Sequence, residues 1–239
     1  MISYMRMMKK LSLSAFAAIC MGGTICITSA AAQTQDAMPD RQFSVATGEA
    51  VNNTLILINT NKHQEALVKL TALTDGVALT PYERSTIFQM QGASYYELSQ
   101  YQNAIDAFEN AVRAGGLLPD EATTLKLNIA LLNIANSQYA KGAAALEDYF
   151  IRGGELKPQF IEILVQAWVQ ADDYSKALPW AEKWFESAAP KERKHYDLMN
   201  FLYSQLGMDS YQVDIINQMI LRWPEDENLR KALSVVQAR

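Results

Sequence analysis

Residues 99–116 read SQYQNAIDAFENAVRAGG, and residues 137–154 read SQYAKGAAALEDYFIRGG. The second stretch begins 38 residues after the first, and seven of the eighteen aligned positions are identical. Apolar side chains recur at helical spacing in both stretches, and the alternation typical of strands is absent. A fixed period of this length with two helical stretches per unit indicates an all-α helical solenoid.

The turn between the two helices of each unit can be followed along the chain. Successive turn positions are spaced by 38, 38, 35 and 35 residues, and they are His63, Tyr101, Tyr139, Tyr174 and Asp209. This spacing predicts about five helix-turn-helix repeats over residues 44–224. The two wider gaps predict longer connections between repeats at residues 79–81 and 117–119.

The repeat resembles the tetratricopeptide repeat (TPR), whose first helix carries a large, a small and a Tyr position and whose second carries Ala and Phe. The clearest copy has Phe88, Gly92, Tyr95, Ala104 and Phe108 at these positions. Looser copies occupy residues 161–190 and 196–224, and the copy around residues 54–70 is the most degenerate. The resemblance implies a right-handed superhelical solenoid.

Helix boundaries are marked by the usual terminal residues. Pro81 and Pro119 are expected at the first position of a helix, each followed by an acidic residue in the first turn. The pairs Gly115-Gly116 and Gly153-Gly154 are expected to end helices, where Gly supplies a positive φ. Residues 225–239 are predicted to form a C-terminal capping helix that covers the end of the stack.

The N-terminal 32 residues have the pattern of a signal peptide. Arg6, Lys9 and Lys10 precede an apolar stretch over residues 11–27, and residues 30–32 are three alanines. We expect cleavage after Ala32 and a flexible segment over residues 33–43; a retained membrane anchor is the alternative. Several early Met residues leave the start of the chain open.

Composition excludes several classes of function. The net charge is −5, and loss of the three basic residues of the signal peptide would make it −8, which is unsuited to nucleic acid or anionic membranes. Cys20 and Cys26 both lie in the signal segment, so no disulfide is expected after cleavage. Two histidines cannot form a multi-histidine metal site, and no metal or cofactor is expected.

No catalytic constellation is recognisable, and we expect a non-enzymatic protein. His63 and His195 are interpreted as solvated surface residues in an inter-helix turn and a charged helix start. The Asp172-Asp173 pair is interpreted as a turn, because a calcium loop needs further spaced acidic ligands. Glu97 and Glu162 form the only carboxylate pair that could be nominated for glycoside hydrolysis, on residue type alone.

The expected functional surface is a concave groove. In tetratricopeptide arrays the first helices of the repeats line such a groove, and a partner segment lies in it. The corresponding positions here carry amides, acids, aromatics and aliphatics, a mixture that suits a peptide partner. The predicted partner-binding residues are Gln89, Tyr96, Asn128, Leu131, Glu162, Gln166, Asp197, Phe201 and Gln205. Ala93 and Ile134 occupy further groove positions.

A narrower resemblance concerns residues 81–109 and 164–182 and the pair Trp223-Pro224. These stretches are similar to periplasmic TPR proteins that accompany TonB–ExbB–ExbD systems of Gram-negative bacteria. The resemblance implies a periplasmic accessory protein of TonB-dependent transport, with an envelope protein or peptide as partner. The alternative is an envelope small-molecule or glycan binder that uses Trp168, Trp180 and Trp184, although the spacing of the last two favours packing.

Overall fold

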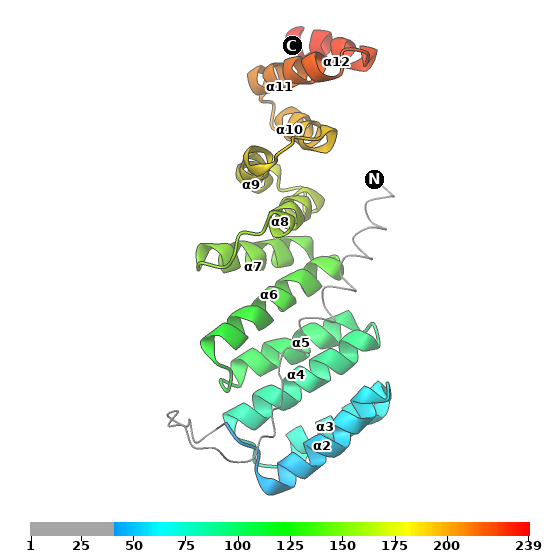
Figure 1. The fold of residues 1–239 in the computed structure, drawn as a ribbon, viewed down its shortest axis with the longest axis vertical. Coiled ribbons are helices and arrows are strands. Elements are labelled where there is room, and N and C mark those ends of the chain that lie inside the picture. The colour runs from blue at the N-terminus through cyan, green and yellow to red at the C-terminus, as the bar shows by residue number, and fades with distance from the viewer. Residues whose placement is uncertain (1–40) are drawn as a thin grey trace. The chain divides into compact units, whose positions relative to one another are not determined.

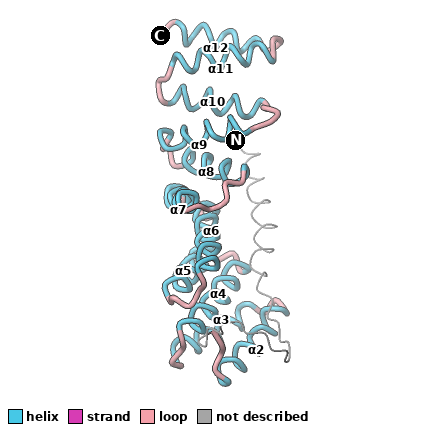
Figure 2. Tube along the Cα trace, turned by 60° about the vertical axis from the view of Figure 1, so that its left-hand side comes forward, coloured by secondary structure: helices cyan, strands magenta, loops and turns pink. Residues whose placement is uncertain are grey.

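The computed structural model describes residues 41–239, and all regular structure in this range is α-helical (Figure 2). The predicted signal peptide, together with residues 33–40 of the predicted flexible segment, lies outside the described residues. Contacts between residues divide the chain into two compact units, which meet in sequence between Gln138 and Tyr139. The two units are described one at a time.

Unit 1 holds five helices in its described part. Each of them contacts the next in chain order, and α2 also touches α4 (Figure 1). Thus two helix pairs, α2 with α3 and α4 with α5, are followed by a single helix, α6. The bounds are α2 Val45–Asn59, α3 His63–Gly76, α4 Pro81–Glu97, α5 Tyr101–Arg113 and α6 Pro119–Ala135.

Unit 2 holds six helices, again in contact in chain order. The single helix α7 is followed by the pairs α8 with α9 and α10 with α11, and α12 packs on α11. The predicted third repeat is therefore divided between the units, with α6 in one and α7 in the other. The bounds are α7 Tyr139–Ile151, α8 Pro158–Gln170, α9 Tyr174–Ser187, α10 Arg193–Gln205, α11 Asp209–Arg222 and α12 Glu227–Gln237.

The predicted turn positions are confirmed, because α3, α5, α7, α9 and α11 begin at these five residues. One backbone motif produces all five turns. In the turn before α5, the Ser99 N–H donates to Tyr96 O at 2.8 Å, and the Gln100 N–H donates to Tyr95 O at 2.9 Å. This pair of bonds requires a left-handed residue two positions before the second helix. Those residues are Asn61, Ser99, Ser137, Asp172 and Gly207, with φ between 57° and 64°.

Glycine should be the better residue at the left-handed serines. Ser99→Gly and Ser137→Gly are each expected to raise the free energy of unfolding by about 0.5–1 kcal/mol, because the left-handed conformation costs a side chain about 1–2 kcal/mol. Urea unfolding followed by circular dichroism measures this. In the matched control, Ser234→Gly within α12, the change should instead cost about 0.5 kcal/mol. A loss of stability in all three variants would contradict the turn argument.

The predicted helix ends are also confirmed. Thr80 Oγ1 accepts from the Glu83 N–H at 3.2 Å, while Glu83 Oε2 accepts from the Thr80 N–H at 2.8 Å. This reciprocal capping begins α4 just before Pro81. Gly115 and Gly153 have φ of 76° and 89° as expected for residues that follow a helix.

The N-terminal segment of the described chain binds back onto α4 and α6. The Ser44 N–H donates to Glu83 Oε1 at 2.8 Å, so that one buried carboxylate holds both this segment and the start of α4. Arg41 pairs with Glu121 of α6 at 2.8 Å and lies over the Tyr82 ring. Residues 41–44 are thereby fixed to the rest of unit 1.

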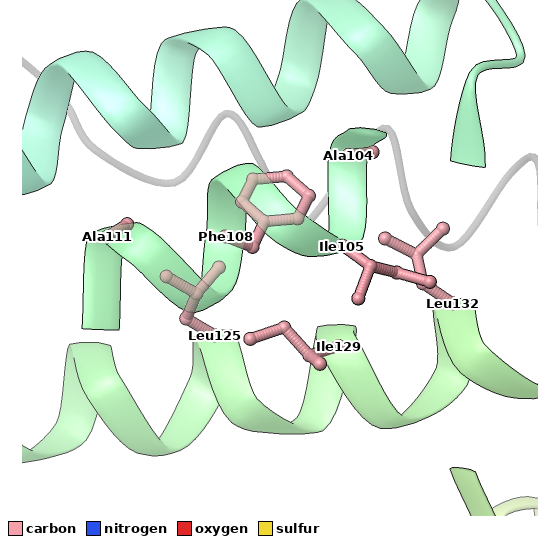
Figure 3. Packing of buried hydrophobic residues seen from close by; sticks show 7 residues of the cluster. All are labelled: Ala104, Ile105, Phe108, Ala111, Leu125, Ile129 and Leu132. Atoms are coloured by element: carbon pink, nitrogen blue, oxygen red, sulfur yellow. The ribbon is translucent and has the colours of Figure 1, made fainter. Parts of the chain in front are cut away.

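The core between α5 and α6 shows why the repeat needs its small and aromatic positions. We name its buried residues the α5–α6 cluster; they are Ala104, Ile105, Phe108, Ala111, Leu125, Ile129 and Leu132 (Figure 3). Phe108 fills space beside Gly92 of α4. A Cβ atom built on Gly92 would lie 2.5 Å from Phe108 Cδ1, too close for any side chain without a shift.

The C-terminal helix α12 begins after Asp226, whose side chain accepts from the Asn228 N–H. Leu229 and Val236 are buried, and α12 packs on α11, as predicted for a capping helix. Among the helices of residues 41–239, none is long and apolar enough to cross a membrane.

Candidate protein-binding surface

In unit 1 the predicted groove residues lie on α4 and α6. Tyr96 and Leu131 are half-buried, and both pack against the α5–α6 cluster. The Tyr96 ring also lies 5.9 Å from the ring of Tyr101, measured between centroids. Gln89 is half-buried about two helix turns further back on α4. These contacts fix the Tyr96 ring and leave part of its surface accessible.

Asn128 and Ile134 lie deeper than the groove prediction places them. Asn128 is only 4% exposed, its Oδ1 atom has no hydrogen-bond partner among the described residues, and Ile134 is also buried. The physical reason is that α6 is apolar on most of its circumference, so that buried residues occur on more than one of its faces. Neither side chain is accessible to a partner in this structure.

In unit 2 the predicted residues lie on α8 and α10. Phe201 of α10 is half-buried, and its ring meets the ring of Tyr174 edge to face at 5.6 Å. Gln205 is exposed at the end of α10, and Gln166 is half-buried on α8. Phe201 therefore resembles Tyr96 of unit 1. Each lies on a first helix and packs against a tyrosine that begins a second helix, Tyr174 for Phe201 and Tyr101 for Tyr96.

Asp197 is engaged within the chain. Its Oδ1 atom lies 2.8 Å from Arg193 Nε, and the same guanidinium contacts Asp226 at 3.0 Å and lies over the Trp223 ring. Hydrogen bonds to Asp197 and Asp226 raise the pKa of Arg193. A partner that uses Asp197 would therefore compete with Arg193, which also joins α10 to the start of α12.

The prediction that His195 is a solvated surface residue is wrong. His195 is 5% exposed, and its ring lies 4.3 Å from the Trp184 ring, centroid to centroid. Its Nδ1 atom is 2.9 Å from the Glu192 backbone nitrogen, which donates to it. The charged residues before His195 suggested exposure, but Trp184 comes from the preceding helix and covers the ring. The spacing of three from Glu192 was the available sign of a helix-capping role.

A cavity of about 330 Å³ adjoins this pair, and Glu162 of the predicted groove lines it together with Trp184 and His195. Glu162 of α8 and His195 of α10 therefore line the same cavity in unit 2. His195 contributes the surface of its ring to the cavity wall, and its Nδ1 atom accepts the Glu192 backbone N–H.

The three Trp residues of the alternative function belong to the core of unit 2. Trp168, Trp180 and Trp184 are all buried, which confirms the packing interpretation of their spacing. Trp180 Nε1 donates to Glu147 Oε1 at 2.8 Å, and the Lys183 ammonium lies over its ring. The three rings therefore form no open platform on which a sugar could stack.

A second cavity, of about 260 Å³, lies between α9, α10 and α11 and is named the α9–α11 pocket. Acidic and aromatic residues line it, among them Glu182, Tyr203, Tyr211 and Asp214. The sequence prediction missed this pocket. Its only local sign was acidic spacing on α9, where Glu182 and Glu186 lie four residues apart and so share a helix face.

Residues 41–239 contain no group of three His, Cys, Asp or Glu side chains that could hold a metal ion. Glu97 belongs to unit 1 and Glu162 to unit 2.

Comparisons with known proteins bear on the fold. No protein-family model and no curated protein matches the chain. A solved TPR protein from Parabacteroides merdae matches with a TM-score of 0.50 and 15% identity, over 81% of this chain and 73% of that one. YrrB, a TPR protein with an unusual peptide-binding site, matches with a TM-score of 0.50 and 18% identity, over 75% and 87%. The chain has the TPR fold. The MamA RS-1 ArsTM double mutant matches as well, with a TM-score of 0.50 and 14% identity, over 77% of this chain and 99% of that one.

Proposed function

We propose that this TPR-fold chain is an exported, non-enzymatic scaffold that binds another protein through the first helices of its repeats. The observation that carries the proposal is the placement of Tyr96 and Phe201, two half-buried aromatic residues on first helices, each held by a neighbouring ring. Aromatic side chains fixed in this way offer a large contact area at a low cost in conformational entropy. The similarity in fold to YrrB, with its peptide-binding site, supports a peptide segment as the bound element.

The location and the partner system are part of the proposal. The signal-peptide pattern supports export, and the resemblance over residues 81–109 and 164–182 supports a periplasmic accessory role beside a TonB–ExbB–ExbD system. Crosslinking in envelope preparations, followed by mass spectrometry, tests both points. We expect a component of that system, or an outer-membrane receptor that depends on it, among the crosslinked proteins. Crosslinks to cytoplasmic proteins alone would contradict the proposal.

The aromatic residues of the first helices should be required for capture. The double variant Tyr96→Ala, Phe201→Ala is expected to retain at most a tenth of the wild-type capture of the crosslinked partner, because it removes two large contacts. Capture is measured with the purified chain, and circular dichroism verifies that the variant is folded.

The matched control is Val68→Ala with Leu221→Ala, which removes two exposed apolar side chains from the second helices α3 and α11. This control should capture the partner normally. Normal capture by a folded Tyr96→Ala, Phe201→Ala variant would show that the binding surface lies elsewhere.

A further inference from the structure

The α9–α11 pocket of unit 2 is built from the second helices of two successive pairs and from α10 between them. Its deepest lining consists of Met199 and Ile215, which are both buried. Phe185, Tyr203 and Tyr211 add aromatic walls, and the rings of the two tyrosines lie 5.4 Å apart. The pocket therefore offers apolar contacts for an unbranched aliphatic or planar group.

Three carboxylates make the lining of the pocket negative. Glu182 and Glu186 of α9 and Asp214 of α11 all line it. No described Lys or Arg forms an ion pair with any of the three carboxylates. Lys191 contacts the lining through its Nζ, which lies over the Phe185 ring, 5.2 Å from the centroid. Three carboxylates around one small cavity repel one another, so a cation bound among them would be favoured.

Tyr203 gives independent evidence that the pocket is suited to a ligand. This residue is only 8% exposed and lines the pocket, yet within residues 41–239 no group forms a hydrogen bond with its hydroxyl. The hydroxyl oxygen is not among the fully buried polar atoms, so a ligand in the pocket can reach it. Burial raises the pKa of Tyr203, and the Glu182 carboxylate and Tyr211 raise it further. The hydroxyl thus stays protonated and its oxygen is available to accept a hydrogen bond.

We propose that the α9–α11 pocket binds an arginine or lysine side chain of a partner polypeptide. The aliphatic stem would contact Met199 and Ile215, the charged end would pair with the rim carboxylates, and the Tyr203 oxygen would accept one N–H. Aromatic walls favour a cation further, since the faces of their rings attract positive charge. The proposal rests on the proposed function only in taking the partner to be a protein. It places the contact on α9, on α11 and on residues of α10 other than the predicted groove residues.

The test measures binding of fluorescein-labelled hexa-arginine and of hexa-citrulline, its uncharged analogue, to the purified chain by fluorescence anisotropy. The pocket variant is Glu182→Gln, Glu186→Gln, Asp214→Asn. The matched control is Glu49→Gln, Glu225→Gln, Asp75→Asn, which makes the same change in net charge at three exposed sites without a described ion pair. We expect the pocket variant to bind hexa-arginine at least tenfold more weakly and the control less than twofold. Hexa-citrulline should bind weakly to all forms.

A conservative variant separates the phenol from the overall charge. Tyr203→Phe keeps the ring and should weaken hexa-arginine binding about threefold. Equal weakening by the pocket variant and the control would mean that net charge alone attracts the peptide, and would overturn the proposal. So would tighter binding of spermine than of hexa-arginine, which would identify a free polyamine, or a dimer of the chain that the pocket variant abolishes, which would identify a second copy.

These outcomes are independent of the groove. The Tyr96→Ala, Phe201→Ala variant retains the pocket and should bind hexa-arginine like the wild type. If that variant captures the partner normally while the pocket variant loses hexa-arginine, the groove assignment fails and the pocket remains. If the pocket variant binds hexa-arginine normally while the Tyr96→Ala, Phe201→Ala variant loses the partner, the pocket assignment fails and the groove assignment remains.

Discussion

Replacing Glu83 with glutamine is expected to lower the free energy of unfolding of unit 1 by about 2 kcal/mol at neutral pH. The Glu83 carboxylate is 1% exposed and accepts the backbone N–H groups of Ser44 and Thr80, one on each oxygen. Glutamine keeps the shape but presents an NH2 group to one of these two donors. Urea unfolding followed by circular dichroism measures the loss.

The effect of Glu83→Gln should depend on pH with a definite sign. Burial raises the pKa of Glu83, but the hydrogen bonds from Thr80 and Ser44 lower it by more, so that it lies below the ordinary value of 4.5. A carboxyl group with a lowered pKa in the folded state contributes stability above its unfolded pKa. That contribution is lost as the pH falls through the folded pKa. The stability curves of wild type and variant should therefore converge in acid.

Glu121→Gln is the matched control, because Glu121 accepts the Leu118 N–H at the start of α6 in the same way. Its side chain is 42% exposed, and solvent screens its pair with Arg41, so the loss should stay below about 1 kcal/mol. If Glu83→Gln and Glu121→Gln cost the same, or if the difference between wild type and Glu83→Gln is independent of pH, the role given to the Glu83 carboxylate is wrong.

The second large effect is expected at Gly92, where alanine should destabilise unit 1 by about 2 kcal/mol. The added Cβ would lie 2.5 Å from both Cδ1 and Cε1 of Phe108, a ring that is itself buried and cannot swing into solvent. The clash must exceed the stabilisation of about 1 kcal/mol that alanine gives over glycine within a helix. Thermal and urea unfolding measure the net change.

Two further variants isolate the clash at Gly92. Gly76 is the last residue of α3 and has nothing within 4 Å of a built Cβ, so Gly76→Ala should be neutral or slightly stabilising. The second variant is Gly92→Ala combined with Phe108→Leu, which provides space for the new methyl group. This double variant should be more stable than the sum of the single changes predicts. Strict additivity would show that the ring and Gly92 do not interact as described.

Much of the fold follows from short-range pattern. The starts of the second helices at His63, Tyr101, Tyr139, Tyr174 and Asp209 were all predictable from spacing, as were the helix starts at Pro81 and Pro119. These features depend on bonds between residues three to five positions apart, and such bonds are encoded locally. The small and aromatic positions Gly92, Ala104 and Phe108 were predictable for a related reason, since a repeated unit must bury the same face against each neighbour.

The candidate site was less predictable, because accessibility depends on segments far apart in the chain. Asn128 is buried although its neighbours in sequence do not require it, and His195 is covered by Trp184 from another helix. The α9–α11 pocket combines Glu182, Tyr203 and Asp214 from three helices, and no spacing along the chain relates them.

The amino-acid sequence thus suffices for the repeat, its turns and its helix ends, because hydrogen bonds within a few residues and a recurring apolar face specify them. Which polar and aromatic side chains remain accessible is settled by the packing of one helix on the next. That packing buries Trp168, Asn128 and His195. It leaves the carboxylates of Glu182 and Asp214 at an open cavity, without an ion pair to any Lys or Arg of residues 41–239.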